Sequence, residues 1–389
     1  MAKETIKISE NVLSWIYDKY ADKLGTAYKN FLLWLNGEKE PTVKQTIDLF
    51  NKLNLPIRYM FLNNPPKEEL KLVEFRTIDS QELVNNPSRE LMDVYSNMLE
   101  IKDWMVNYSK SNELEPLDFV GCCNGITDKH IITNRIMQEM NLLFNDFNQM
   151  TDARSLFNFI RKKCEDIGII VMMNGIIGSN THRKLNINEF RAFALVDEYA
   201  PLIFINSADS FNARLFSLLH EIVHIFIGAT DLYNLQEYNS FGVSKMEILC
   251  NAVAAEILIP DQYIKNEFEK IKNSNKDKYS VISGLKAIFK GSEYVIIRKL
   301  LDNRLITKSD YDELIGNYKK KYIEQLNNKK SARGGNYNVT LKTRIDNRLA
   351  MALKSSAENG AISYVDVYRM TYTNSSTFDK LIRNIRGDY

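Results

Sequence analysis

Two histidines and a glutamate stand together near the middle of the chain. His220, Glu221 and His224 interrupt the apolar run over residues 215–227, in which Ser217 is the only other polar residue. A helix this apolar is buried, and positions i and i+4 lie one turn apart on one face, so the two imidazoles can bind one metal ion. In this H-E-x-x-H arrangement zinc lowers the pKa of bound water to about 7, and the glutamate takes its proton during attack on a carbonyl. The segment predicts the site of a zinc-dependent hydrolase.

The alternative is that the two histidines are ordinary core residues with satisfied hydrogen bonds. Only 4 histidines occur in the 389 residues, so a chance match to the motif is uncommon. A match inside an otherwise apolar helix is rarer still. We therefore favour metal binding.

A catalytic zinc site needs a third protein ligand and an open position. Candidates lie in the next apolar helix, which we expect to end at Pro260 and whose only acids are Glu247 and Glu256. These two are nine positions, or two and a half turns, apart, so they face opposite sides and cannot both reach one ion. For Glu256 the alternative is a carboxylate on the surface, or one that contacts the metal ligands without binding the metal itself. Cys250 could be a soft ligand, but a small buried apolar side chain is the better interpretation.

The elements that position this helix differ along the chain. Apolar residues at helical spacing predict three helices: 89–111, 129–147 and 152–165. Short apolar or alternating runs predict three strands of one small sheet: 167–173, 190–196 and 201–206. Helices are expected again from 209 to about 327.

Blocks on both sides of the motif form a wider pattern. In chain order they are Asn180-Thr-His182-Arg183-Lys-Leu185, Phe190-Arg191-x-Phe193-Ala-Leu-Val196, Ala200-Pro201-x-Ile203-Phe204-Ile205-Asn206, Phe216-x-x-x-His220-Glu221-x-x-His224, and Glu247-x-x-Cys250-Asn251-x-x-Ala254-Ala255-Glu256-x-Leu258-x-Pro260. Together they resemble the ImmA/IrrE family of zinc metallopeptidases, over about residues 160–320.

This resemblance implies a fold, a ligand set and a substrate class. The fold is α+β and mainly helical, with a zincin-like core of a small mixed sheet and the H-E-x-x-H helix. The implied ligands of Zn²⁺ are His220, His224 and Glu247, with Glu221 as the catalytic base. The implied reaction is proteolysis of helix-turn-helix (XRE-type) repressors in prophage, mobile-element or stress circuits.

Two further expectations concern the substrate. The peptide should pair along an edge of the small sheet, at the 201–206 strand. His182, in the loop that follows Gly178, is our candidate for the oxyanion partner because histidine is scarce here. A hydrogen bond that anchors the loop is the alternative.

The first 76 residues resemble the XRE-like helix-turn-helix module found ahead of long family members. The carrying residues are Trp15, Leu24-Gly25, Phe31, Trp34-x-x-Gly37-Glu38-x-x-Pro41-Thr42, Leu49, Leu53 to Phe61, and Phe75-Arg76. Gly37 should end one helix, and Pro41 with Thr42 should begin the next. Residues 1–70 hold ten Lys and Arg against nine Asp and Glu, so protein contact is as consistent with this module as DNA binding.

The other end of the chain is basic. Residues 318–389 contain fourteen Lys and Arg against six Asp and Glu, although the whole chain has a net charge of +2. This segment could contact nucleic acid or an acidic protein face, or it could be a solvated surface. Gly334-Gly335-x-Tyr337, Ile362-Ser363-Tyr364 and Ser376-Thr377-Phe378-Asp379 are similar to the tail of long family members.

Composition sets the remaining bounds. We expect an HTH-like module at 1–76, a helical scaffold at 77–160, a metallopeptidase domain at 161–327 and a basic segment at 328–389. Four cysteines without a C-x-x-C pair predict reduced thiols and a cytoplasmic protein, and no export or membrane segment is evident. Two other functions stay open: a DNA-binding transcriptional regulator, or a non-cleaving antirepressor, each with a structural zinc site.

Overall fold

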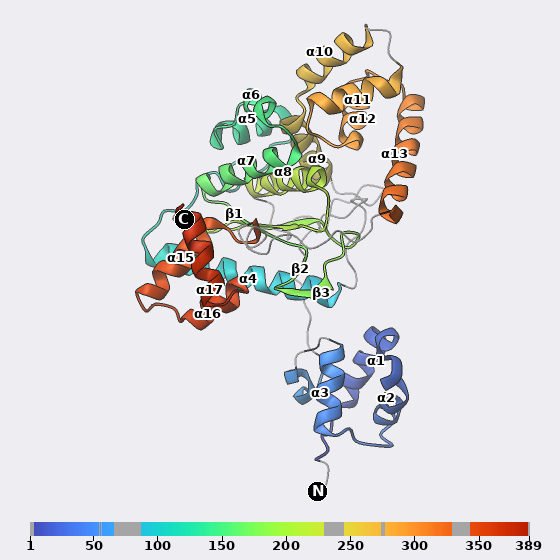
Figure 1. Cartoon of the computed structure of the whole chain (residues 1–389), viewed down its shortest axis with the longest axis vertical. Coiled ribbons are helices and arrows are strands. Elements are labelled where there is room, and N and C mark those ends of the chain that lie inside the picture. The colour runs from blue at the N-terminus through green and yellow to red at the C-terminus, as the bar shows by residue number, and fades with distance from the viewer. Residues whose placement is uncertain are drawn as a thin grey trace. The chain divides into compact units, whose positions relative to one another are not determined.

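The computed structural model describes residues 4–53, 55, 57–65, 87–228, 245–273, 277–328 and 343–387. The chain divides into two compact units, Met1–Lys71 and Leu72–Tyr389, whose elements Figure 1 labels. The expected boundary at 76, and the motif residues Phe75, Arg76, Gly334, Gly335 and Tyr337, lie outside the described residues. Among the helices described, none is long and apolar enough to cross a membrane.

The first unit is a small helical module. Its elements are α1 (Glu10–Leu24), η1 (Gly25–Ala27), α2 (Tyr28–Leu35), α3 (Val43–Lys52) and η2 (Ile57–Phe61). Buried Ile16, Phe31 and Phe50 join three of these elements in one core. Thr42 caps the start of α3, where the sequence predicts that a helix begins, and it forms a reciprocal capping box with Gln45. Gly37 has a φ of +70° just after α2, which fits its predicted role at a helix end.

Four helices open the second unit. They are α4 (Arg89–Ser111), α5 (Lys129–Glu139), α6 (Phe144–Gln149) and α7 (Ala153–Ile167). The predicted helix over 129–147 is wrong in one respect, since it is two helices. Asn141 has a φ of +46°, and a left-handed residue cannot continue an α-helix.

A small sheet follows, and its strand order is β1-β5-β4. Strand β1 (Ile170–Asn174) runs parallel to β5 (Leu202–Asn206), and β4 (Ala192–Leu195) runs antiparallel to it. The three predicted strands in one sheet are therefore confirmed. The expectation of a substrate edge at 201–206 is wrong, because β5 is the central strand: Ile203 pairs with Val171 on one side and with Ala194 on the other. A separate hairpin joins β2 (Ile176–Ile177) to β3 (Asn180–Lys184).

Helices cover both faces of this sheet (Figure 1). The remaining helices before the C-terminal segment are α8 (Phe211–Ile227), α9 (Lys245–Leu258), α10 (Asp261–Lys272), α11 (Lys278–Ile288), α12 (Glu293–Asp302) and α13 (Lys308–Asn328). One face of the sheet shares a core with α7, α8 and α9, to which Ile203 and Ile205 contribute. On the other face Tyr95 of α4 packs against Phe193, with ring centroids 5.6 Å apart.

The last helices, α15 (Asn347–Glu358), α16 (Tyr364–Thr371) and α17 (Ser375–Arg386), lie beside β1 (Figure 1). The chain just before α15 hydrogen-bonds to that strand. Buried Arg161 donates to the carbonyl oxygens of Thr343, Val171 and Ile345 at 2.6, 3.0 and 3.0 Å. Asp346 Oδ2 accepts from the N–H of Val171 at 3.1 Å. The C-terminal segment thus occupies the outer edge of β1.

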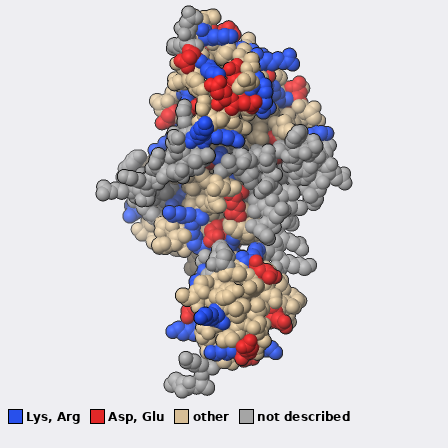
Figure 2. Space-filling model, turned by 90° about the vertical axis from the view of Figure 1, so that its right-hand side faces the viewer, with Lys and Arg blue, Asp and Glu red and all other residues tan. Residues whose placement is uncertain are grey.

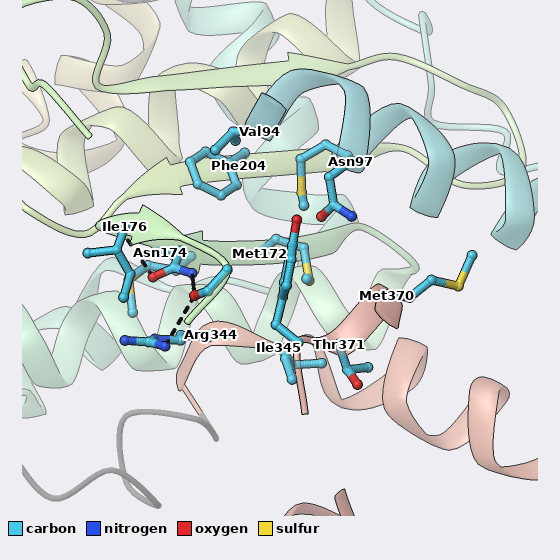
Figure 3. Close-up of a pocket in the computed structure, with 14 residues that line it drawn as sticks. Val94, Asn97, Met172, Asn174, Ile176, Phe204, Arg344, Ile345, Met370 and Thr371 are labelled. Carbon is cyan, nitrogen blue, oxygen red and sulfur yellow. Dashed lines mark hydrogen bonds between the residues drawn. The ribbon is translucent and has the colours of Figure 1, made fainter. Parts of the chain in front are cut away.

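A small cavity lies in the seam between α4, the start of β2 and the C-terminal helices (Figure 3). Its walls include Met172, Phe204 and Met370, while Asn174 and Arg344 both donate to the carbonyl oxygen of Gly178, at 2.9 and 3.5 Å. The cavity volume is about 40 Å³. This space holds a few water molecules and is far below the size of a ligand site, so the seam is a packing interface.

Candidate metal centre

Helix α8 is buried along its whole second half. Every residue from Leu215 to Ile227 is buried, as the apolar run predicts. Ser210 caps its N-terminus, and its C-terminus ends at Gly228, which has a φ of +73° and donates to the His224 carbonyl at 3.0 Å. His220 and His224 therefore sit on a helix that is fixed at both ends.

Helix α9 packs against α8 and brings a carboxylate to the two imidazoles. Glu247 Oε2 lies 3.2 Å from His220 Nε2, and Glu247 Oε1 lies 2.9 Å from His224 Nε2. The two Nε2 atoms are 3.0 Å apart. The structure thus brings together the three residues that the sequence assigned as metal ligands, and their ligand atoms converge on one point.

The spacing of these atoms fits a tetrahedral ion. Ligand bonds of about 2.05 Å imply about 3.3 Å between neighbouring ligand atoms of a tetrahedron. The observed separations of 3.2, 2.9 and 3.0 Å are slightly shorter. Two neutral imidazoles can share at most one proton between their facing nitrogens, whereas a cation can bind both at once. The residues present therefore fit a divalent metal.

The pKa shifts show that the cluster stabilises positive charge. Burial opposes protonation of His224, but the neighbouring Cys250 and Glu247 raise its pKa well above the ordinary value. Burial likewise opposes ionisation of Glu247, but His220 and His224 hold its pKa well below the ordinary value. A site that holds an anionic carboxylate and favours a charge on its imidazoles is complementary to a cation.

Two buried side chains adjoin the ligands. Glu221, the candidate base, is 1% exposed and follows His220 directly on α8. Cys250 is fully buried on α9, and burial raises the pKa of its thiol despite the opposing effect of His224. Cys250 is thus buried, as predicted, but its thiol also interacts with the imidazole of His224. All four cysteines are free.

His182 lies apart from this cluster in the contacts of the structure. It is exposed on β3, and its backbone N–H donates to Asn180 Oδ1 at 3.0 Å. Its imidazole makes no hydrogen bond or ion pair to any residue that the structure describes, which does not favour the loop-anchoring alternative. The adjacent Arg183 has a structural role, since it pairs with Glu90 and Asp93 of α4 at 3.2 and 2.7 Å.

The other acid of α9 belongs to a second polar cluster. Glu256 is 5% exposed, so it is not on the surface. It pairs with Lys299 of α12 at 2.6 Å and with Lys129 of α5 at 3.3 Å, and both lysines also reach Asp261. Glu256 thus joins three helices at the opposite end of α9 from Glu247.

Sequence reasoning did not identify this second cluster, although a signal was present. Lys299 stands in α12 among the apolar residues Ile296, Ile297 and Leu300, and it is 3% exposed. A lysine in such a position needs a carboxylate partner. The partners come from α9 and α10, and the pattern of a single helix cannot identify them.

Comparisons with known proteins agree with this geometry. Residues 164–301 match Peptidase_M78, the IrrE N-terminal-like domain. Residues 345–384 match a domain of unknown function, DUF8813. The chain matches no curated protein and no solved structure. No family match covers the helix-turn-helix module expected at the N-terminus.

The match over 164–301 contains β1, the central sheet, α8 and α9, and hence all three converging ligand residues. The chain therefore carries an IrrE N-terminal-like domain of the Peptidase_M78 type, a metallopeptidase domain with His220, His224 and Glu247 as its candidate metal site.

Proposed function

We propose that the chain is a zinc-dependent endopeptidase that cleaves a regulatory protein, namely a helix-turn-helix repressor of a prophage, a mobile element or a stress response. The observation that carries the proposal is the convergence of His220, His224 and Glu247 beside the buried carboxylate of Glu221, inside a Peptidase_M78 domain. The substrate class rests on the resemblance to the ImmA/IrrE family.

Zinc is the metal that this ligand set favours. Two imidazoles and one carboxylate at tetrahedral spacing leave one position open, as catalytic zinc sites do. When bound, zinc supplies Lewis-acid chemistry, since it polarises a carbonyl and lowers the pKa of water.

The protein side chains then divide the remaining work. Glu221 accepts a proton from the attacking water and passes it to the leaving amine. Its burial keeps bulk water away from the carboxylate, so its proton transfers are confined to the site. His182, predicted from the sequence, is our candidate for a donor to the developing oxyanion, although its exposed imidazole on β3 contacts none of the three candidate metal ligands in the structure.

In the three-stranded sheet that the structure describes, one edge is available for a substrate backbone to pair with. Strand β1 is bonded on its outer side to Asp346 and Arg161, and β5 is central. Strand β4 pairs only with β5 among the described strands. We therefore place an extended substrate along β4, next to α8, in β-strand addition.

The decisive experiment compares the parent chain with Glu221→Gln. Each is incubated with candidate repressors encoded near its gene, with and without a zinc chelator, and metal content is measured by atomic emission. We expect about one zinc per chain in both proteins, and a 100- to 10,000-fold loss of cleavage in Glu221→Gln, the range for removal of a general base. Glu198→Gln makes the same chemical change at an exposed position and should cleave like the parent.

Other results would point elsewhere. Equal cleavage by Glu221→Gln and the parent would refute the assignment of the base. If the parent binds a repressor without cutting it, and Glu221→Gln is equally effective in cells, the protein is an antirepressor. His182→Ala should lower kcat at unchanged zinc content, and an unchanged kcat would remove His182 from the mechanism.

A further inference from the structure

The C-terminal helices form a helix-turn-helix that the peptidase reaction does not use. Helices α16 and α17 are joined by only three residues, 372–374. Tyr372 ends α16 in the left-handed conformation with a φ of +51°, and Asn374 caps α17 by accepting from the Thr377 N–H at 3.0 Å. Phe378 and Leu381 of α17 are buried, as is Leu353 of α15. A short turn between two packed helices is the arrangement that places a second helix in a DNA groove.

The exposed face of α17 is basic. Ser376, Lys380, Arg383 and Arg386 are all exposed, at spacings that keep them on one side of the helix. Asp379 is the only acid in this helix; it is also exposed and lies on the same side, one turn before Arg383. No ion pair within 4 Å joins Lys380, Arg383 or Arg386 to an acid that the structure describes. Arg386 acts at longer range on Glu358 of α15, where it lowers the pKa less than Lys354 does. Three cations on one helix face are thus available to phosphate groups.

Other cations of the same segment are already engaged. Arg369 of α16 pairs with Glu100 of α4 at 2.6 Å, and Lys354 of α15 pairs with Glu358. Arg344 donates to the Gly178 carbonyl. The charge that remains available therefore concentrates on α17.

Other helical surfaces offer less. Helix α2 of the first unit has Lys29 as its only cation. Over α10 to α13, basic and acidic side chains are interspersed on the face shown in Figure 2, where many are paired, for example Lys278 with Asp310 and Arg298 with Asp302. An excess of cations on one exposed helix face is the electrostatic footprint of nucleic-acid binding, and α17 presents three cations and one acid there.

We propose that residues 343–387 bind duplex DNA, with α17 in the major groove. Lys380, Arg383 and Arg386 contact phosphates or guanine edges, and Ser376, near the start of the helix, adds a polar group that can bond to phosphate or base. The segment is fixed to the peptidase domain, because the Tyr372 ring lies against Gly178, where a Cβ would meet it at 2.5 Å. DNA binding would therefore hold the peptidase domain close to a repressor on its operator, a consequence that rests on the proposed function.

The test measures binding of the full chain to a fluorescein-labelled 30-base-pair duplex of random sequence, by fluorescence anisotropy between 50 and 200 mM salt. Three phosphate contacts predict a slope of about −2.7 in log K against log salt concentration, which is about a 40-fold loss of affinity over this range. The triple variant Lys380→Gln, Arg383→Gln, Arg386→Gln should lose this slope and bind more than tenfold more weakly at 50 mM salt. Each single variant should reduce the slope by about one.

A matched control removes the same charge elsewhere. Lys265, Lys270 and Lys272 are exposed on α10, and their triple glutamine variant should bind DNA like the parent. Thermal unfolding shows whether each variant remains folded, and the single variants provide the test if the triple variant does not. Equal weakening in both triple variants would overturn the proposal, since binding would then reflect net charge alone. Absence of DNA binding by the parent at 50 mM salt would also overturn the proposal. So would a loss of DNA binding in Lys29→Gln that the α17 variants do not show.

Discussion

The C-terminus of α8 packs against the backbone of a neighbouring loop so closely that no side chain fits at Gly228. A Cβ added at Gly228 would lie 2.7 Å from the Cα of Gly121. Gly228 also has a φ of +73°. The loop that contains Gly121 is hydrogen-bonded to α8, since the N–H groups of Gly121 and Cys123 donate to Ile225 and Phe226 at 3.0 and 2.8 Å. We therefore predict that Gly228→Ala destabilises the helix that carries His220 and His224.

The expected loss of unfolding free energy in Gly228→Ala has two parts. A left-handed conformation costs an alanine about 1 to 2 kcal/mol. To reach ordinary contact at 3.4 Å the loop must withdraw by about 0.7 Å, which weakens or breaks the two hydrogen bonds to α8, at about 1 kcal/mol each. The sum is about 3 to 4 kcal/mol of unfolding free energy, and about 2 kcal/mol of it comes from the contact.

Two glycines of the same loop separate these parts. Gly125 has a φ of +76°, and a Cβ added there would meet nothing within 4 Å, so Gly125→Ala should cost the conformational part alone. Gly121→Ala should cost the same, because its Cβ would lie 3.6 Å from the Gly228 Cα, an ordinary contact. Urea unfolding at fixed zinc concentration, followed by circular dichroism, measures all three. If Gly228→Ala and Gly125→Ala differ by less than about 0.5 kcal/mol, the contact does not restrain α8.

Two further predictions concern polar contacts between helices and strands, namely the ion pairs of Asp261 and the hydrogen bonds of Arg161. Hydrogen bonds from Lys129 and Lys299 outweigh burial and lower the pKa of Asp261 below 3.8, so its stabilisation is present above about pH 4 and is lost as the pH falls. Urea titrations should show that Asp261→Asn lowers the free energy of unfolding by about 3 kcal/mol at pH 7, and that this difference from the parent becomes smaller in acid. A difference that does not change with pH would contradict the pKa shift. Arg161→Met removes three hydrogen bonds to carbonyl oxygens and should cost about 3 kcal/mol in the same assay, with Arg161→Lys in between; equal stability of Arg161→Met and the parent would show that these bonds do not fasten the C-terminal segment.

Local pattern was enough to predict the parts of the site that lie within single elements. The apolar run around His220 and His224 specified a buried helix, and the alternating runs specified β1, β4 and β5. The pairing order of those strands is not a local property. Nothing in residues 201–206 indicates that both neighbours are in place, so the central position of β5 emerged only from the structure.

The sequence also could not predict which distant residues contact one another in the folded chain. Asp346 and Arg161 are 185 positions apart, yet both bond to Val171 in the same sheet edge. The sequence indicated a basic C-terminal segment but not which of its cations are neutralised by distant acids such as Glu100. Helix α17 is identified as the exposed basic face only after the cations that pair with acids in the structure are excluded.

The two polar clusters on α9 differ in how their charges are balanced, which makes the first the stronger candidate metal site. Each contains a carboxylate of α9: the partly buried Glu247 at the start of the helix and the buried Glu256 near its end. A buried charge must be balanced, and two lysines balance the charges of Glu256 and Asp261 without any added ion. Glu247 faces the imidazoles of His220 and His224, and no lysine or arginine is paired with it among the ion pairs of the described residues. A proton or a metal cation can balance its charge, and three converging ligand atoms favour the metal.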